Sequence, residues 1–328
     1  MGYSYSIIKE LQLSDFHIRN VLFAQFDNIV FLVKYKDFEK YFAIKAVDGS
    51  IGIKEENDDK RTSLEKAINE RNFLVEFMKL KNPFLIKIEF AFFDVRNLYI
   101  GTEYMQCGSL LDNLEHFQEL DIERVKFYVI ELLITIDFLH KKNISHGNIK
   151  LDHILLDDKG HIKLTGFNKC KYFKKYKERK TFNDEELIDW HDFGAILYYL
   201  LLEKRKAYIL SKNFDMMNDL KTISEVAYNL VQKLLNKEFK SVEQIKNEQF
   251  FDGVNWIKYE KLEIKPPYER KFSNKEDCSC FPFSKKDNLE KIIRGLIECP
   301  IKTNLIKQKA KELKNYDYIS INFRIIDT

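Results

Sequence analysis

A short stretch in the middle of the chain, from Ile144 to Asn168, places the tightest limit on the fold. It begins as a polar loop and continues as two short apolar runs, Ile154–Leu156 and Ile162–Leu164. The segment Asp157–Gly160 lies between the runs and predicts a turn, because a glycine there can take a positive φ. The pattern therefore predicts a small hairpin with a polar loop at each end.

Polar residues flank this hairpin at a fixed spacing. His146-Gly147-Asn148 precedes it, and Gly166-Phe167-Asn168 follows it. The spacing resembles the catalytic segment of eukaryotic protein kinases, where a His-Arg-Asp loop, an Asn and an Asp-Phe-Gly triplet flank such a hairpin. Matched by position, Asn148 replaces the catalytic Asp, His153 the metal-binding Asn, and Gly166 the metal-binding Asp, while Lys150 retains the loop lysine.

Composition bounds the class of protein. A chain of 328 residues, 45% of them hydrophobic, is long enough for a two-lobed domain with substantial cores. The net charge of +3 gives no case for binding nucleic acid. The chain lacks an apolar run of about eighteen residues, so we expect no membrane span. The missing signal-peptide pattern and five unevenly placed cysteines indicate a cytoplasmic or nuclear protein.

Two short local patterns carry little information about function. Met1–Ser6 fits the loose signature for myristoylation of Gly2, but a signature this short often matches by chance, so modification is left open. Cys278-Ser-Cys280 lacks a second cysteine pair at zinc spacing, so no metal site is expected there.

The first hundred residues have the pattern of a sheet with one helix. Three alternating runs, Phe16–Val21, Ile29–Val33 and Tyr41–Val47, predict a meander of strands. A helical apolar stripe follows over Ser63–Leu80. Two further strands are predicted over Phe84–Phe93 and Leu98–Thr102.

Lys45 and Glu70 lie where the resemblance places an ion pair. The run Ala43-Ile44-Lys45 resembles the kinase strand whose lysine holds nucleotide phosphates, and Glu70 occupies the position of the helix glutamate that pairs with this lysine. The alternative is a solvated strand lysine and an exposed helix carboxylate.

The loop between the first two strands departs from the family pattern. Its three glycine positions are occupied by Phe23, Gln25 and Asn28, and Asp27 adds negative charge. Side chains would then stand between the backbone and a phosphate, so the resemblance implies impaired phosphate binding.

An adenine slot is implied by a second group of matches. Thr102–Leu110 resembles the kinase hinge, whose backbone meets adenine. Backbone hydrogen bonds need no particular side chain, so ATP stays a candidate ligand. The residues that the resemblance assigns to nucleotide binding are Lys45, Glu70, Glu103, Met105, Val30, Ala43 and Leu155.

The remainder of the matching region is predicted to be helical. Helices are expected over Leu110–Glu119, Glu123–Lys142, Ile223–Leu235 and Val242–Phe251. Glu186–Leu201 resembles the buried helix at the centre of the kinase large lobe, with Asp189 as its characteristic carboxylate, and His140 is expected to be a core or end-of-helix histidine. The cationic run Asn168–Lys180 predicts a solvated loop or a docking site for an acidic partner.

The end of the chain resembles kinases of the AGC group, such as the catalytic subunit of the cAMP-dependent protein kinase, through Phe250–Ile257 and Ile264–Pro267. A helix over Asn288–Ile297 and a strand or hydrophobic motif over Tyr318–Ile325 are expected in the tail. We therefore predict an N-terminal extension over 1–14, a small lobe over 15–104, a large lobe over 105–267 with a shortened activation segment, and an AGC-like tail over 268–328.

The fold class expected is α+β: a bilobal protein-kinase-like fold with a small lobe of five antiparallel strands and one main helix, and a mainly helical large lobe. Packing positions are retained, since Leu74, Ile88, His146 and Phe167 match the stacked residues of the family.

The residues that the resemblance assigns to proton transfer and metal binding are replaced. Asn148 cannot accept a proton at neutral pH, and losing a general base costs on the order of 10²–10⁴ in rate. Gly166 offers no ligand, and Mg²⁺ prefers hard oxygens to the imidazole of His153. Asp152 and Asp157 are nearby substitutes, although each carboxylate would have to move.

We therefore predict a pseudokinase that acts as a protein-binding scaffold or allosteric regulator in intracellular signalling. A divergent active serine/threonine protein kinase and a metal-independent nucleotide-binding module are the alternatives. No cofactor is certain; ATP is a candidate and Mg²⁺ is not expected. The expected partners are proteins, with an active kinase or an acidic segment as candidates, bound by a monomer or within a hetero-complex.

Overall fold

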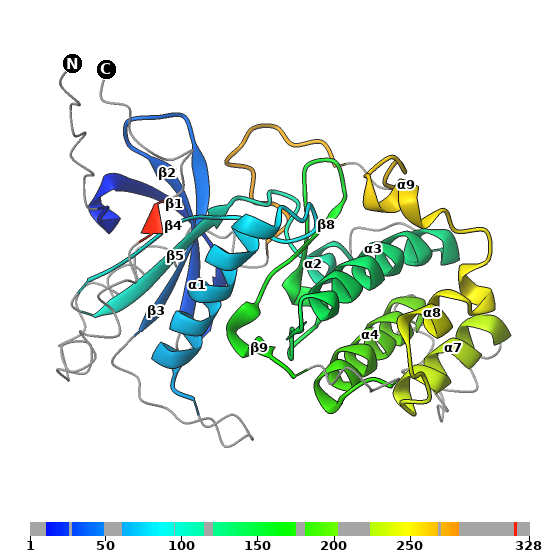
Figure 1. Ribbon diagram of the computed structural model, residues 1–328. Helices are drawn as coiled ribbons and strands as arrows, with labels where there is room; N and C mark the ends of the chain where they lie inside the picture. The colour runs from blue at the N-terminus through cyan, green and yellow to red at the C-terminus, as the bar shows by residue number, and fades with distance from the viewer. Residues whose placement is uncertain are drawn as a thin grey trace, which may run out of the picture. The chain divides into compact units, whose positions relative to one another are not determined.

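The computed structural model describes residues 11–25, 28–48, 61–94, 96–114, 121–174, 181–202, 224–267, 270–281 and 318–319. The chain forms two compact units (Figure 1). Unit 1 contains Met1–Asn82, Ile86–Gln106 and Phe272–Thr328, and unit 2 contains Pro83–Leu85 and Cys107–Lys271.

Unit 1 is built on an antiparallel sheet. Its strands are β1 (Phe16–Ala24), β2 (Asn28–Tyr35), β3 (Tyr41–Asp48), β4 (Ile88–Phe93) and β5 (Asn97–Glu103). The sheet order is β1-β2-β3-β5-β4, and the five predicted strands are confirmed. A sixth strand from the tail, β10 (Tyr318–Ile319), pairs with Ala91 and Phe90 of β4, which agrees with the first two residues of the strand expected there.

Aromatic side chains fill the core on one face of this sheet. Alternate residues of a strand point to the same face, which brings Phe16, Phe42 and Phe90 together. The Phe16 and Phe90 rings stack with centroids 5.0 Å apart, and Phe42 meets Phe90 edge to face at 5.2 Å. Contacts of this kind add to the gain from burying the rings themselves.

Helix α1 (Ser63–Leu80) contacts β3, β4 and β5. It begins with a capping box, in which Thr62 Oγ1 accepts from the Glu65 backbone N–H and the Glu65 carboxylate accepts from the Thr62 N–H. It ends at Lys81, which takes the left-handed conformation with a φ of 50°. The helix predicted from the apolar stripe is confirmed at both ends.

The strand predicted from Phe84 starts later, at Ile88. Leu85 instead forms a parallel bridge with Leu164, and the Leu164 N–H donates to the Phe84 carbonyl at 2.7 Å. The prediction was wrong here because an apolar run cannot distinguish one long strand from two segments that pair with different partners.

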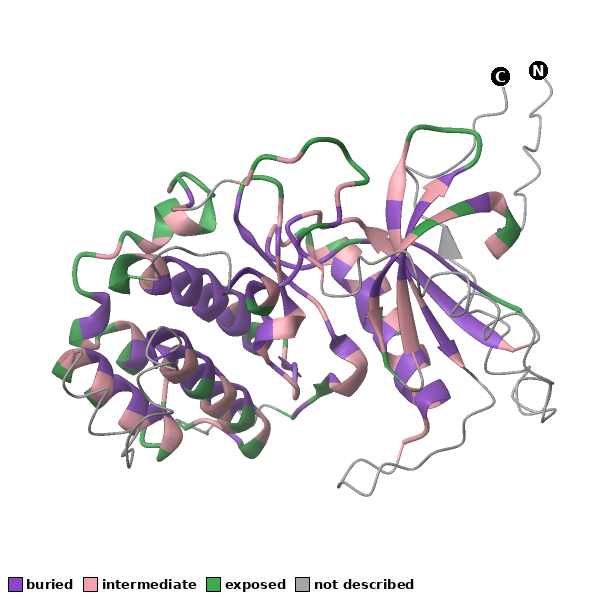
Figure 2. Cartoon of the chain, turned by 180° about the vertical axis from the view of Figure 1, so that it is seen from behind, coloured by how far each residue is buried: buried purple, intermediate pink, exposed green. Residues whose placement is uncertain are grey.

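Unit 2 is built around two long helices, α3 (Ile122–Lys141) and α4 (Asp184–Leu202), with α7 (Glu225–Leu235) packed on α4. Figure 2 shows α3 buried along most of its length. Gly194 allows the close approach of α7, since a Cβ at that position would lie 2.7 Å from the Leu234 Cβ. The remaining helices of unit 2 that the structure describes in full are α2 (Leu110–Leu114), α8 (Val242–Lys246) and α9 (Trp256–Glu260).

The helix predicted over Val242–Phe251 is interrupted. Helix α8 ends at Lys246, and a separate 3₁₀ turn spans Gln249–Phe251. The Asn247 and Glu248 N–H groups close α8 by donating to Glu243 and Ile245. The apolar positions continue at a spacing that both arrangements satisfy, so the break is not visible in the sequence.

The central hairpin is confirmed as β7 (Ile154–Leu156) paired with β8 (Ile162–Leu164). Gly160 in its turn has a φ of 95°. The Asp157 carboxylate organises the turn by accepting from the backbone N–H groups of Lys159 and His161. A two-residue pair, β6 (Ile144–Ser145) with β9 (Lys171–Tyr172), brackets the polar loops on either side of the hairpin.

Several expectations concern residues outside the described ranges. These are Gly2, Asp27, the end of the helix predicted to Glu119, Ile223, the cationic residues from 175 to 180, the helix over Asn288–Ile297 and the strand beyond Ile319. Within the described parts of the chain, no helix is long and apolar enough to cross a bilayer.

Candidate functional site

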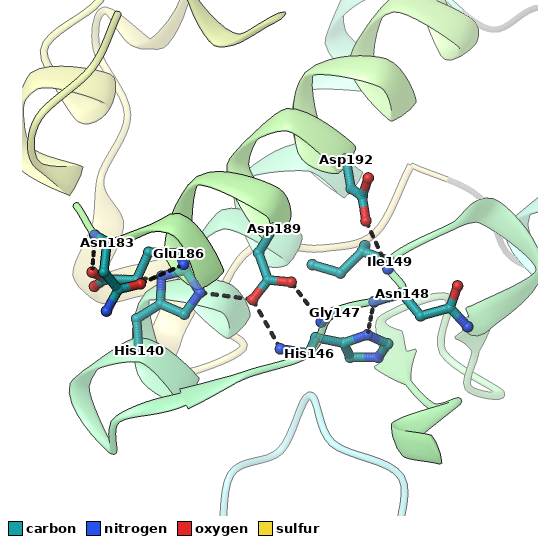
Figure 3. A network of polar contacts seen from close by, with 9 residues as sticks. All are labelled: His140, His146, Gly147, Asn148, Ile149, Asn183, Glu186, Asp189 and Asp192. Atoms are coloured by element: carbon teal, nitrogen blue, oxygen red, sulfur yellow. Dashed lines mark hydrogen bonds and ion pairs between the residues drawn. The ribbon is translucent and has the colours of Figure 1, made fainter. Parts of the chain in front are cut away.

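The polar loop before the hairpin is held by one buried carboxylate, Asp189 of α4 (Figure 3). Asp189 Oδ2 accepts from the His146 backbone N–H at 2.8 Å, and Oδ1 accepts from the Gly147 N–H at 2.7 Å. His140 Nε2 lies 2.8 Å from Oδ2. Asp189 is fully buried, so these contacts replace the water that the carboxylate loses. The predicted core role of His140 is confirmed, with an added polar role that the sequence did not indicate.

The His146 side chain continues this frame on the other side of the loop. Its Nδ1 accepts from the Asn148 N–H at 3.2 Å, so its Nε2 is the nitrogen that donates to the Thr165 carbonyl at 2.9 Å. The Phe167 ring lies 5.1 Å from the His146 ring. The loop and the segment after the hairpin are therefore fixed to each other through His146.

Asn148 occupies, within this ordered loop, the position that the resemblance assigns to the catalytic aspartate. Figure 3 shows its side chain directed away from the Asp189 carboxylate. An amide offers a carbonyl acceptor and an NH₂ donor, and it carries no basic group near neutral pH. The side chain of Asn148 therefore cannot take a proton from an acceptor hydroxyl.

His153 and Gly166 face each other where the resemblance places two metal ligands. Gly166 has a φ of 81° and a ψ of 39°, in the left-handed region. A Cβ built on Gly166 would lie 2.5 Å from both Cγ and Nδ1 of His153. His153 Nδ1 lies 2.8 Å from the Asn148 carbonyl, a distance at which the ring N–H donates to that oxygen.

A magnesium ion does not fit the donors of this position. Gly166 has no side-chain donor, and the nitrogen of His153 nearest to it is engaged with the Asn148 carbonyl. The two carboxylates that could substitute are engaged elsewhere: Asp152 pairs with Lys150 at 2.8 Å, and Asp157 organises the hairpin turn. Among the described residues, no group of three His, Cys, Asp or Glu side chains could hold a metal ion.

Asp192 adds a carboxylate beside the loop that sequence reasoning missed. Its Oδ2 accepts from the Ile149 N–H at 3.2 Å (Figure 3). Burial, with the nearby Asp189 carboxylate, raises the pKa of Asp192 to about 6, against the opposing effects of the Ile149 N–H and Lys169. The available signal was its position three residues after Asp189 in a helix, which places both on one side.

In unit 1, Lys45 and Glu70 form the ion pair that the resemblance implies. Lys45 Nζ lies 2.7 Å from Glu70 Oε2, and the Glu70 side chain is 5% exposed. Glu70 is therefore a buried carboxylate of α1 with a cationic partner on β3. The alternative of two solvated residues was wrong.

Val30 and Ala43, two of the predicted nucleotide-binding residues, lie on one face of the unit 1 sheet. Val30 and Ala43 pack against the buried Leu22, Leu32 and Cys278. The Phe281 and Tyr104 rings belong to the same cluster and stack with centroids 6.2 Å apart. Two slot residues therefore pack against an apolar cluster that includes residues of the tail.

The other predicted nucleotide-binding residues are placed as follows. Glu103 ends β5, where its N–H donates to the Lys87 carbonyl and its carboxylate accepts from the Lys87 N–H. Met105 follows β5 and is half-buried. Leu155, in unit 2, is half-buried in β7 and bridges to Ser109. A role in binding nucleotide stays a prediction for all seven residues.

The tail segment over 272–281 is fastened to unit 1 by polar contacts. Tyr104 Oη lies 3.6 Å from Cys278 Sγ, and Gln106 Nε2 donates to the carbonyls of Asn274 and Asp277. Glu276 accepts from the Tyr41 hydroxyl and pairs with Arg19 at 3.2 Å. The residues between the large lobe and the distal tail lack a periodic pattern, so the sequence did not reveal this contact.

Comparison with known proteins gives one family. A model of the protein kinase domain matches residues 28–251. The chain is 29% identical over 284 residues to the serine/threonine-protein kinase sck2 of Schizosaccharomyces pombe, which is 77% of this chain and 43% of that protein. It is 26% identical to sgk-1 of Caenorhabditis elegans, over 91% of this chain and 67% of that protein. It is also 26% identical to Sgk1 of Rattus norvegicus, over 93% of this chain and 76% of that protein.

Proposed function

Because the chain belongs to the protein kinase family, we propose from the state of its site that it is a pseudokinase of the AGC group, an inactive kinase-like protein. One observation carries this proposal. The loop frame is complete, with Asp189 accepting from His146 and Gly147, while the three chemical positions hold Asn148, His153 and Gly166. The structure of the loop is maintained without the groups that transfer phosphate.

The expected loss of rate is large. Phosphoryl transfer depends on a carboxylate that orients the acceptor hydroxyl and on Mg²⁺ that bridges the phosphates. Loss of the general base costs on the order of 10²–10⁴ in rate. Loss of metal stabilisation adds several kcal/mol, and each ~1.4 kcal/mol is roughly tenfold. These losses together exceed what the retained Lys150 can offset, particularly since Lys150 pairs with Asp152.

The function that we assign to this chain is binding of other proteins, as a scaffold or allosteric regulator within the cell. The buried frame around Asp189 supports this, because the loop is held in one conformation although it has lost its chemical groups. We also propose the division into an extension over 1–14, a small lobe over 15–104, a large lobe over 105–267 and a tail over 268–328.

A second function is favoured by the ion pair between Lys45 and Glu70. This pair orients the Lys45 cation on β3 through a protein carboxylate, so the arrangement needs no metal ion. We include metal-independent binding of ATP as a structural ligand, with Lys45, Glu70 and the backbone around Glu103 as the binding groups. A divergent active kinase is the contrary hypothesis; the ion pair of Lys45 with Glu70 is compatible with it, whereas Asn148, His153 and Gly166 are not.

Two measurements on the purified chain test these proposals. The first is transfer of labelled phosphate from ATP to protein substrates, for which we expect no incorporation above that of Lys45→Met. The second is the thermal shift caused by ATP, with and without Mg²⁺, because a ligand that binds the folded state stabilises it according to its concentration over Kd.

For nucleotide binding we expect a shift that does not depend on Mg²⁺ and that is lost in Lys45→Met. Lys40→Met is the matched control, since Lys40 lies one residue before β3 and pairs with Glu89 instead. No shift at millimolar ATP would leave protein binding alone. Phosphate incorporation that Lys45→Met abolishes would overturn the pseudokinase proposal.

A further inference from the structure

We propose that His153 and Gly166 are a single coupled replacement, in which the His153 imidazole fills the space of a side chain at position 166 and closes the metal position to divalent cations. This inference rests on the proposed function, because it explains why the side chains at this position do not fit a metal ion. It adds a specific claim, which is that the two positions cannot be restored one at a time.

The space beside Gly166 is filled by the ring of His153. A Cβ at this residue would lie 2.5 Å from Cγ, 2.5 Å from Nδ1 and 2.6 Å from Cε1 of His153. Carbon atoms in ordinary van der Waals contact are about 3.5–4.0 Å apart. The obstacle is therefore the face of the ring, and any residue larger than glycine must displace it.

The His153 ring is itself held in place. Its Nδ1 is bound to the Asn148 carbonyl at 2.8 Å, and its centroid lies 6.2 Å from that of His146. The backbone is fixed as well, since the His153 N–H donates to the Lys150 carbonyl and its own carbonyl accepts from the Thr165 N–H, both at 2.9 Å. The second bond ties His153 to the residue next to Gly166.

Two constraints, one on the backbone and one on side-chain volume, require glycine at position 166. Its φ of 81° lies in the left-handed region, where a Cβ is strained. The ring of His153 adds a second, steric constraint that depends on residue 153 alone. The two constraints can be separated experimentally, because the chain contains another left-handed glycine. Gly253 has a φ of 77° and nothing within 4 Å of a Cβ built on it.

The test is a double-mutant cycle between Gly166→Ala and His153→Ala, measured by urea unfolding of the full chain. We expect Gly166→Ala to reduce the folding equilibrium constant far more than Gly253→Ala does. In the His153→Ala background the two glycine substitutions should have the same effect. The coupling between positions 153 and 166 should amount to about tenfold or more, within the range for residues in contact.

If Gly166→Ala alone fails to fold, recovery of soluble folded protein by adding His153→Ala supports the same coupling. An equal effect of Gly166→Ala in both backgrounds would overturn the proposal. The inference and the proposed function fail separately, since the cycle measures stability and the phosphate-transfer assay measures activity.

A separate experiment tests whether His153 closes this position to divalent cations. Mn²⁺, followed by electron paramagnetic resonance, serves as the probe for divalent cations. We expect neither the unmodified chain nor Gly166→Asp to bind Mn²⁺ at this position, and we expect His153→Asn with Gly166→Asp, which restores an oxygen donor at both positions, to gain Mn²⁺ binding. Mn²⁺ binding by the unmodified chain that His153→Ala abolishes would contradict the proposal, because His153 would then be a ligand.

Discussion

At the scale of single residues, Asp189 has the largest structural consequence. Both of its oxygens accept from backbone N–H groups of the loop, and His140 lies against one of them. Backbone donors in a loop have no strand or helix to satisfy them, so a buried carboxylate from another element takes that role. The loop conformation is therefore set by a side chain more than forty residues away in sequence.

Replacing this carboxylate tests that dependence. Asp189→Asn leaves one oxygen acceptor and turns an NH₂ group toward a backbone donor, so we expect the free energy of unfolding to fall by about 2–4 kcal/mol. Urea denaturation followed by circular dichroism measures the change. Asp158→Asn is the control, because Asp158 is exposed in the hairpin turn. A loss no larger than that of the control would contradict the role given to Asp189.

The ionised carboxylate of Asp192 lowers the stability of the folded state. Its pKa is raised to about 6 by burial and by Asp189, from an ordinary value of 3.8. Between these two values the folded chain binds more protons than the unfolded chain. Stability contributed by Asp192 therefore falls as the pH rises through this window, and it stays low above about pH 6.

Asp192→Asn removes this titration and keeps an oxygen that can accept from the Ile149 N–H. We expect the variant to exceed the unmodified chain in free energy of unfolding by about 1–2 kcal/mol at pH 7.5, with the gain shrinking toward pH 4. Denaturant unfolding of both proteins across that range measures the difference. A gain that is the same at both pH values would rule out titration of Asp192 as the cause.

At the scale of elements, the tail segment over 272–281 completes one face of the unit 1 sheet. Cys278 is buried with Leu22 and Leu32, beside the half-buried Val30 and Ala43. Burial raises the pKa of the Cys278 thiol, so it stays a neutral apolar group in this cluster. The sheet therefore depends on residues far along the chain for part of its apolar cover.

A charge placed in this cluster should release the segment. Cys278→Asp buries a carboxylate among apolar side chains, and we expect it to lower the free energy of unfolding by about 2 kcal/mol or more. Hydrogen exchange should show lost protection in β1, β2 and β3, with α3 unchanged. Lys275→Asp also introduces a carboxylate, with a larger change in net charge, at an exposed position of the same segment and should have little effect. Unchanged protection in Cys278→Asp would contradict the docking.

At the scale of the whole molecule, the two units differ in how many separate segments of the chain form each of them. Unit 2 is almost one continuous segment, Cys107–Lys271, joined by Pro83–Leu85. Unit 1 combines the first part of the chain with the tail. Unit 1 therefore needs contacts between residues more than two hundred positions apart, such as the hydrogen bond from Tyr41 to Glu276. Such contacts carry a larger entropy cost of loop closure than local ones.

Much of the fold followed from the sequence alone, since periodicity and turn residues report local structure directly. The five strands, the hairpin around Gly160 and the helix over Ser63–Leu80 were all predicted from such patterns. The resemblance also implied the ion pair of Lys45 with Glu70, which the structure contains, because the spacing between motifs carries the family's geometry. The roles assigned to Asn148, His153 and Gly166 stay predictions.

The tertiary structure alone decided how distant residues meet. Nothing in the sequence indicated that Cys278 would join the apolar cluster against which Val30 and Ala43 pack, or that the strand after Phe84 would begin late. The spacing of Asp189 and Asp192 placed both on one side of a helix, but only the structure showed that Asp192 accepts from the Ile149 N–H. The tertiary structure also decided that the ring of His153 occupies the space beside Gly166. In the sequence, His153 and Gly166 are two separate replacements of expected metal ligands. In the structure, the ring at one position fills the space beside the other. Patterns along a chain record which faces are apolar, whereas packing against distant segments sets which atoms touch.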